Sequence, residues 1–161
     1  MPKLIKDGQI VEDNWLLVRE TTSDLPHGNI IIALPLWITH KETLTQRKGE
    51  IGLLLASNEE AESVENDVNF FNVIALDFPM FADGRSYTNA RILRERYNYQ
   101  GEIRAVGDVL QDQLFYMKRC GFNAFSLRED KDIEAALSSL NDFSESYQAA
   151  VDQPLPLFRR R

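Results

Sequence analysis

The stretch Leu76–Gln113, LDFPMFADGRSYTNARILRERYNYQGEIRAVGDVLQDQ, carries the pattern that decides the fold. An apolar run ends at Leu76, a turn-rich segment with several arginines follows, and a second apolar run, Glu102–Val106, ends at Gly107 and Asp108. Short apolar runs joined through a helical segment are typical of βαβ units, in which helices cover parallel strands. The same alternation extends along the chain on both sides of this stretch.

Five such apolar runs predict parallel strands, and the segments between them predict helices. Spacings typical of capping boxes occur at Thr39–Glu42 and Ser57–Glu60 and predict helix starts there. Ahead of these units, the segment Lys3–Val18 predicts a β-hairpin that turns at Asp7-Gly8, with a further short strand at its end. The expected strands are 30–34, 51–56, 73–76, 102–106 and 122–127, and the expected helices are 41–48, 57–70, 86–97, 108–120 and 132–148.

The predicted fold class is therefore α/β, with about five βα units, a mainly parallel sheet and an N-terminal hairpin over residues 3–18. The sheet is either open and doubly wound or part of a β/α barrel. A complete eight-unit barrel needs ~250 residues, and the chain has 161. We expect a single domain over residues 1–150 and a flexible or docking tail over residues 151–161, which hold two prolines and three terminal arginines.

Composition indicates a cytosolic protein. The longest apolar run, Ile30–Ile38, is interrupted by Pro35, and a membrane span requires ~20 apolar residues. The N-terminal segment has no apolar signal core. The single cysteine, Cys120, excludes an internal disulfide and a cysteine-based metal cluster. We therefore expect neither a membrane association nor a metal site.

Charge is unevenly distributed along the sequence. The formal net charge is −7, which disfavours nucleic-acid binding because phosphate neutralisation needs a basic face. Residues 85–128, however, hold 8 basic and 4 acidic side chains, a net charge of +4. A cationic segment within an acidic chain suits an anionic ligand or an acidic protein partner.

Polar side chains follow the predicted strands, where ligands gather in parallel α/β sheets. Arg85 is the strongest ligand candidate, because it follows a glycine turn and opens a helix. Each of several candidates also has a structural alternative. Asp108 and Gln111 have the spacing of a helix cap. Arg104 could pair with a carboxylate within its strand, and Arg91 and Arg94 could lie on a solvated helix face. The candidate ligand-binding residues are Asp77, Asp83, Arg85, Arg104, Asp108, Asp112 and Gln113.

Other unusual residues favour structural roles. Cys120 lies near a predicted helix end, where the dipole does not stabilise a thiolate, so a buried thiol is expected. Phe78 and Phe81 are expected either in the core or in an exposed contact patch. The sequence contains no GxGxxG motif, no Walker loop and no iron–sulfur cysteine set, so no cofactor is expected.

Four elements between Leu76 and Phe125 resemble one bacterial family: LDFP, F-DGR-Y--AR-LRE, GE-RAVGDVL-DQ and RCGF-AF. The chain is similar to the family catalogued as domain of unknown function 934. Its members are commonly described as oxidoreductases of assimilatory sulfite reduction and tend to be encoded beside sulfite reductase. The resemblance implies a pathway and supplies no catalytic residues.

Three hypotheses follow from these observations. The favoured one is an accessory protein of sulfate and sulfite reduction that docks on sulfite reductase or its electron-donor protein, with electrons supplied through the partner. The second is an enzyme or sensor that binds a small anion, such as sulfite, sulfate or a sulfated nucleotide. The third is a structural subunit whose homo-oligomer buries the patch at Phe78 and Phe81. Whether the protein is catalytic is left open by its sequence.

Overall fold

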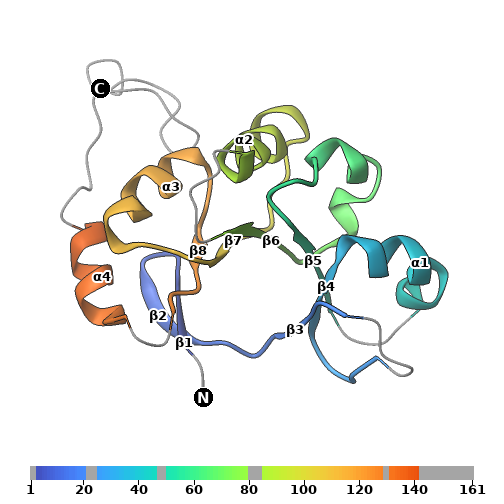
Figure 1. Cartoon of the computed structure of the whole chain (residues 1–161), viewed down its shortest axis with the longest axis horizontal. Coiled ribbons are helices and arrows are strands. Elements are labelled where there is room, and N and C mark those ends of the chain that lie inside the picture. The colour runs from blue at the N-terminus through green and yellow to red at the C-terminus, as the bar shows by residue number, and fades with distance from the viewer. Residues whose placement is uncertain (1–2, 21–24, 47–49, 80–84, 129–130, 142–161) are drawn as a thin grey trace.

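A computed structural model describes residues 3–20, 25–46, 50–79, 85–128 and 131–141, which form a curled sheet with helices on its outer side (Figure 1). The strand order is β2-β1-β8-β7-β6-β5-β4-β3. The strands are β1 Lys3–Lys6, β2 Gln9–Glu12, β3 Leu16–Val18, β4 Ile30–Ala33, β5 Ile51–Leu55, β6 Val73–Phe78, β7 Glu102–Gly107 and β8 Ala124–Phe125. The α-helices are α1 Leu34–Thr45, α2 Arg85–Arg91, α3 Leu114–Cys120 and α4 Ile133–Asn141.

Strands β3 to β8 run parallel to one another, whereas β1 is antiparallel to both of its neighbours. The N-terminal hairpin is confirmed: β1 and β2 pair through Asp7 and Gly8, whose φ angles of 51° and 79° suit a tight hairpin turn. The hairpin joins the sheet through the pairing of Ile5 with Phe125. The segment between β2 and β3 then runs across the open side of the curl (Figure 1).

The α/β class is confirmed, but the five βα units are not, because the segment between β5 and β6 forms two short 3₁₀ helices. These are η1 Ala61–Val64 and η2 Val68–Phe70. The expected capping box at Ser57–Glu60 is also absent, since the Glu59 carboxylate instead accepts a hydrogen bond from the Ala56 amide at 2.7 Å. Like charges at helical spacing repel one another, which disfavours a regular α-helix here. The acidic side chains in this segment are Glu59, Glu60, Glu62, Glu65 and Asp67.

Other helices differ from expectation in their limits. Helix α1 begins at Leu34, directly after β4, because Pro35 suits a first helical turn. Thr39 therefore lies within the helix and donates to the Pro35 carbonyl at 2.9 Å instead of capping a helix start. Helix α2 continues into a π turn, η3 Ile92–Arg96, and α3 follows a short 3₁₀ turn, η4 Gln111–Gln113. The structure describes only part of the helix expected over 132–148, and that part is α4.

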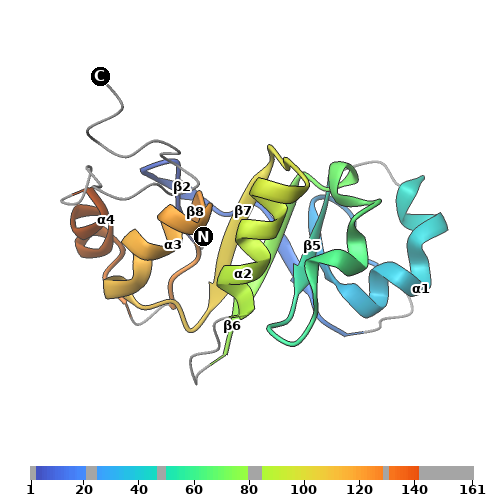
Figure 2. The same cartoon turned by 90° about the horizontal axis from the view of Figure 1, so that it is seen from above.

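The two faces of the sheet have different surroundings. The outer face packs against the four α-helices, which lie in a row along the curl (Figures 1 and 2), and forms the main core with side chains such as Ile32, Leu53 and Ile74. The inner face forms a second, smaller apolar cluster. This inner cluster consists of Ile31, Leu54, Val73, Ala75 and Val106, with Trp15 packed against it.

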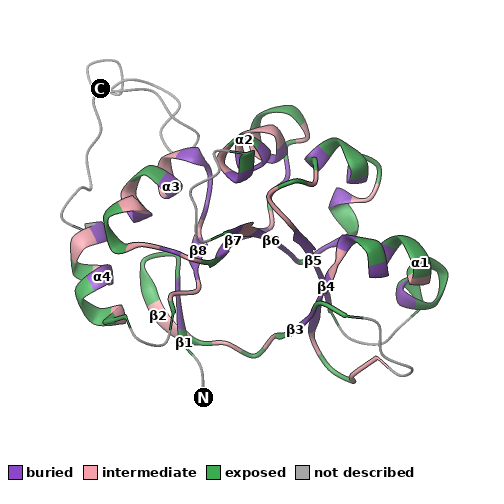
Figure 3. Cartoon of the chain, in the orientation of Figure 1, coloured by how far each residue is buried: buried purple, intermediate pink, exposed green. Residues whose placement is uncertain are grey.

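Burial on both faces explains why the strand sequences are almost continuously apolar. Figure 3 shows the central strands in the colour of buried residues and the outward sides of the helices as exposed. No helix within the described residues has the length and apolar character that crossing a membrane requires.

Candidate functional site

Charged side chains gather where four parallel strands end at one edge of the sheet. Arg19 follows β3, Asp77 lies near the end of β6, Asp108 follows β7, and Arg128 comes shortly after β8. Arg19 Nη1 lies 3.7 Å from Asp77 Oδ2, and Arg128 Nη1 lies 3.1 Å from Asp108 Oδ1. The carboxyl edge of the sheet thus presents two arginine–carboxylate pairs.

A glycine brings the carboxyl ends of β6 and β7 close together. Gly107 has a φ of +90°, and a Cβ at this position would lie 2.5 Å from Asp77 Oδ1 and 2.4 Å from the Phe78 carbonyl oxygen. The Asp108 amide donates to that same carbonyl at 2.7 Å. Only glycine fits both the conformation and the space, so Gly107 fixes Asp77 beside Asp108.

The inner face holds a cavity of about 190 Å³ at this edge. Three arginines line it: Arg19 and Arg128, with side chains 49% and 46% exposed, and Arg104, with a side chain 4% exposed. The remaining walls combine apolar and polar residues. They are Asp13, Trp15, Leu17, Ile31, Val106, Gly107, Ser126 and Leu127.

Arg104 is held by a buried ion cluster on the inner face. Its Nε donates to Glu102 Oε2 at 2.7 Å, and its Nη1 donates to Asp13 Oδ1 at 3.0 Å. Glu102 also pairs with Lys6 at 3.2 Å. The carboxylate partnership considered from the sequence is therefore present, and it attaches the segment between β2 and β3 to the interior of the curl.

The exposed pairs differ from this cluster in strength. Half-exposed ion pairs contribute only about 0–1 kcal/mol, because water screens them. The Arg19–Asp77 separation of 3.7 Å is also long for a charge-assisted hydrogen bond. A small oxyanion in the cavity can therefore accept hydrogen bonds from Arg19 and Arg128 at little energetic cost. A guanidinium group can donate two parallel hydrogen bonds to two oxygens of such an anion.

The other predicted candidates are dispersed. Arg85 lines a separate hollow of about 360 Å³ together with Glu59, Glu60 and Glu62, although its neighbour Ser86 donates to the Asp77 carbonyl at 2.7 Å. Asp112 is exposed on η4, and Gln113 is half-buried there. Asp83 lies outside the described residues. Of the predicted set, Asp77, Arg104 and Asp108 lie on or beside the inner face.

The contacts correct two interpretations, for Asp108 and Arg94, and decide between the two alternatives for Phe78. Asp108 does not cap η4, whose N-cap residue is Leu110 without a side-chain bond, and pairs with Arg128 instead. Arg94 is not on a solvated face: it donates to the carbonyls of Tyr99, Gly101 and Gly121. Phe78 is 5% exposed and packs in the core, so it does not contribute to an exposed patch; Phe81 lies outside the described residues.

The structure adds residues that the sequence did not suggest. Asp13 fell within the hairpin expected over residues 3–18 and Arg19 directly after it, because no local signal shows that β3 pairs in parallel with β4. Cys120 is buried, and burial raises the pKa of its thiol, as expected for a structural cysteine. Within the described residues, histidine, cysteine and carboxylate side chains form no group of three that could hold a metal ion.

The fold and this edge define an α/β protein with a curled, mainly parallel sheet and an arginine-lined inner cavity. The sequence model of a bacterial family, described as bacterial protein of unknown function (DUF934), matches residues 52–158. The chain belongs to this family, and the match includes β5 from its second residue and all of β6 to β8, with Asp77, Arg104 and Asp108. No curated protein is similar enough to the chain to count as a match.

Proposed function

We propose that this protein is an accessory protein of assimilatory sulfite reduction, acting with sulfite reductase or its electron donor, and that it binds a small oxyanion such as sulfite at the carboxyl edge of its sheet. The observation that carries the binding role is the convergence of Arg19, Arg104 and Arg128 on one cavity. The pathway rests on the motif resemblance to the family, whose members are described in those terms.

The dimensions and charges of the cavity favour a small, compact anion. Its volume of about 190 Å³ is below the ~300–1,000 Å³ of drug-sized ligand sites. Arg19 and Arg128 lie half-exposed on its lining, where they can turn toward an oxyanion. Arg104 lies on the same lining with its charge balanced by Asp13 and Glu102, so Arg19 and Arg128 are the arginines that would bind the anion.

Isothermal calorimetry and thermal unfolding with sodium sulfite test the binding role. A ligand at 100 times its Kd should stabilise the folded protein by ~2.7 kcal/mol. We expect Arg19→Ala and Arg128→Ala each to weaken sulfite binding about tenfold or more. Arg96→Ala, which removes an exposed arginine from η3, is the matched control and should bind as the native protein does.

Sodium chloride at the same ionic strength should give no comparable stabilisation. Sulfite binding that is absent, or equally strong in all three variants, would show that the cavity is not the anion site.

The accessory role has its own support in the charge of the outer surface. The outer surface of α2 and η3 includes the exposed Arg85 and Arg96 beside the exposed Glu95. The net charge of +4 over residues 85–128 also counts Arg94 and Arg104, whose side chains are held by part-buried and buried contacts. Complementary charge promotes association between protein partners, and salt weakens it. We expect the purified protein to retain sulfite reductase or its electron donor at low salt and to release it at high salt. Retention of neither protein at low salt would contradict the accessory role and leave the sulfite test unaffected.

A further inference from the structure

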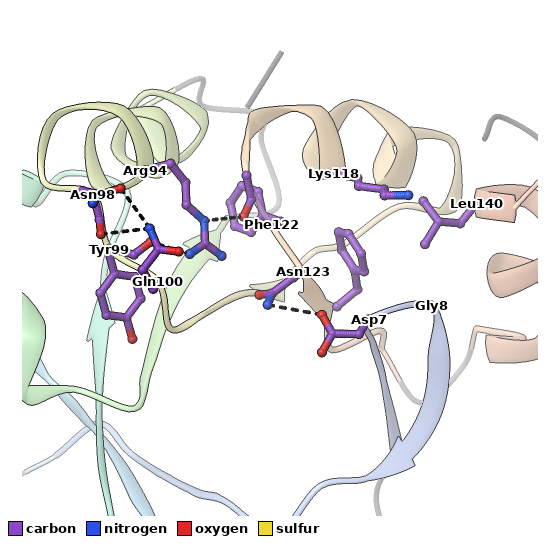
Figure 4. A pocket seen from close by; sticks show the side chains of 12 residues that line it. Asp7, Gly8, Arg94, Asn98, Tyr99, Gln100, Lys118, Phe122, Asn123 and Leu140 are labelled. Atoms are coloured by element: carbon purple, nitrogen blue, oxygen red, sulfur yellow. Dashed lines mark hydrogen bonds between the residues drawn. The ribbon is translucent and has the colours of Figure 1, made fainter. Parts of the chain in front are cut away.

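A second cavity lies at the opposite, amino edge of the sheet, away from the proposed oxyanion site. Its volume is about 580 Å³, within the range of small-molecule sites. It lies between η3, the end of α3, the start of β8 and the β1–β2 turn (Figure 4). The proposed function does not account for this cavity.

The floor of this amino-edge cavity is apolar. Phe122, Phe125 and Leu140 line it and are held in place by the surrounding core, and at 1%, 2% and 5% exposed each presents only a small part of its surface to the cavity. Tyr99 adds a third buried ring, fixed by a hydrogen bond of 2.9 Å from its hydroxyl to the Phe71 carbonyl. A rigid apolar floor of this kind binds an apolar group without ordering new side chains.

The rim of the cavity is polar and carries more positive than negative charge. Arg94 and Lys118 come from the helical layer, and Asp7 comes from the β1–β2 turn on the other side (Figure 4). Asp7 Oδ1 accepts from Asn123 Nδ2 at 3.4 Å. The hydrogen bonds of Arg94 go to neutral carbonyl oxygens, and Asp7 is the carboxylate whose charge acts on it across the cavity. Burial lowers the pKa of Arg94, but a guanidinium remains protonated at neutral pH.

We propose that the amino-edge cavity binds a small organic acid, with its apolar body on Phe122, Phe125 and Leu140 and its carboxylate or sulfonate near Lys118 and Arg94. An anion fits better than a cation because two positive side chains face one carboxylate that already has an amide partner. The site is separate from the proposed oxyanion site, since the two lie at opposite ends of the same strands and share no lining residue.

The test uses two fluorescent probes with the same rings. 8-Anilinonaphthalene-1-sulfonate has an anionic group, and N-phenyl-1-naphthylamine is its uncharged counterpart. We expect saturable binding of both probes to the native full-length chain. Lys118→Glu should weaken binding of the sulfonate about tenfold, because it places a like charge beside the ligand, and should leave the uncharged probe unaffected.

Lys131→Glu is the matched control. Lys131 is exposed and precedes α4, whose residues Ile133 and Leu140 lie about 10 Å apart along the helix axis at a rise of ~1.5 Å per residue. This variant has the same net charge as Lys118→Glu and should bind both probes as the native protein does. Arg128→Ala, which alters the oxyanion site, should do the same.

Near-ultraviolet circular dichroism must show that each variant keeps native packing. Absence of saturable sulfonate binding to the native chain would overturn the proposal. So would a Lys118→Glu variant that binds the sulfonate with native affinity, or one that loses both probes equally while remaining folded.

Discussion

Asp13 and Arg104 lie 91 positions apart in the sequence and form an ion pair of 3.0 Å inside the curled sheet. The pair attaches the segment that crosses the open side of the curl to the middle of β7. Because Glu102 completes the cluster on the same strand, the arginine has two carboxylate partners in a site that water hardly reaches.

Removal of the guanidinium should therefore strongly destabilise the fold. We expect Arg104→Met to lower the free energy of unfolding by about 3–5 kcal/mol, since it leaves Glu102 as a buried charge with reduced compensation. Urea denaturation measures this loss. The double variant Arg104→Met, Glu102→Gln should recover part of it by removing the buried charge. A loss below 1 kcal/mol in the single variant would show that the cluster contributes little.

The close approach of Gly107 to Asp77 predicts a second stability difference. Gly107→Ala meets both a left-handed φ and two oxygen atoms within 2.5 Å, whereas Gly28→Ala has nearly the same φ, +91°, with no atom within 4 Å of the added Cβ. The conformational strain alone is about 1–2 kcal/mol. We expect Gly107→Ala to unfold at lower urea concentration than Gly28→Ala, and equal midpoints would contradict the crowding at the carboxyl edge.

Three backbone carbonyls depend on the planar geometry of Arg94. Its Nε and Nη1 donate to them at distances of 2.7 to 3.0 Å. Lysine has a single ammonium group and does not reproduce this fork. We expect Arg94→Lys to cost about 2 kcal/mol of stability, while Arg96→Lys, an exposed control, should remain within about 0.5 kcal/mol of the native value. Chemical denaturation of the two variants compares them directly.

Stability should decrease in alkaline solution because of Tyr99. Burial raises the pKa of its hydroxyl well above the usual range, so above pH ~10 the unfolded chain loses this proton while the folded chain keeps it. Fewer protons are then bound in the unfolded state, and the free energy of unfolding falls as pH rises. The free energy of unfolding of Tyr99→Phe should decline less steeply between pH 9 and pH 11, an interval of about one pH unit on either side of the unperturbed tyrosine pKa. An unchanged slope would exclude Tyr99 as a cause.

The parallel strands were predictable because they are buried on both faces. The run Ile30–Leu34 became β4 and the run Ile51–Ala56 became β5, with limits within one residue. Helices were less predictable. The segment 57–70 has apolar residues at helical spacing, which predicted an α-helix. Repulsion between its carboxylates disfavours that helix, but no local sequence pattern specifies the 3₁₀ turns that form instead.

The site was only partly predictable, since sequence order locates strand ends and not the face on which a side chain lies. Alternation along β6 places Asp77 on the same side as Val73 and Ala75, so its inner position was open to inference. Arg85 was grouped with Asp77 because it follows β6 in sequence, but it begins a helix on the outer side. Arg19 was missed because pairing between β3 and β4 depends on long-range packing.

The pairing of β1 with β8 has a consequence for synthesis of the chain on the ribosome. Ile5 is made before its sheet partner Phe125, which follows 120 residues later. Until then the N-terminal hairpin exposes Leu4 and Ile5, both almost fully buried in the finished protein. Nascent chains truncated before Phe125 should therefore depend on chaperones, and completion of the sheet must await the release of nearly the whole domain.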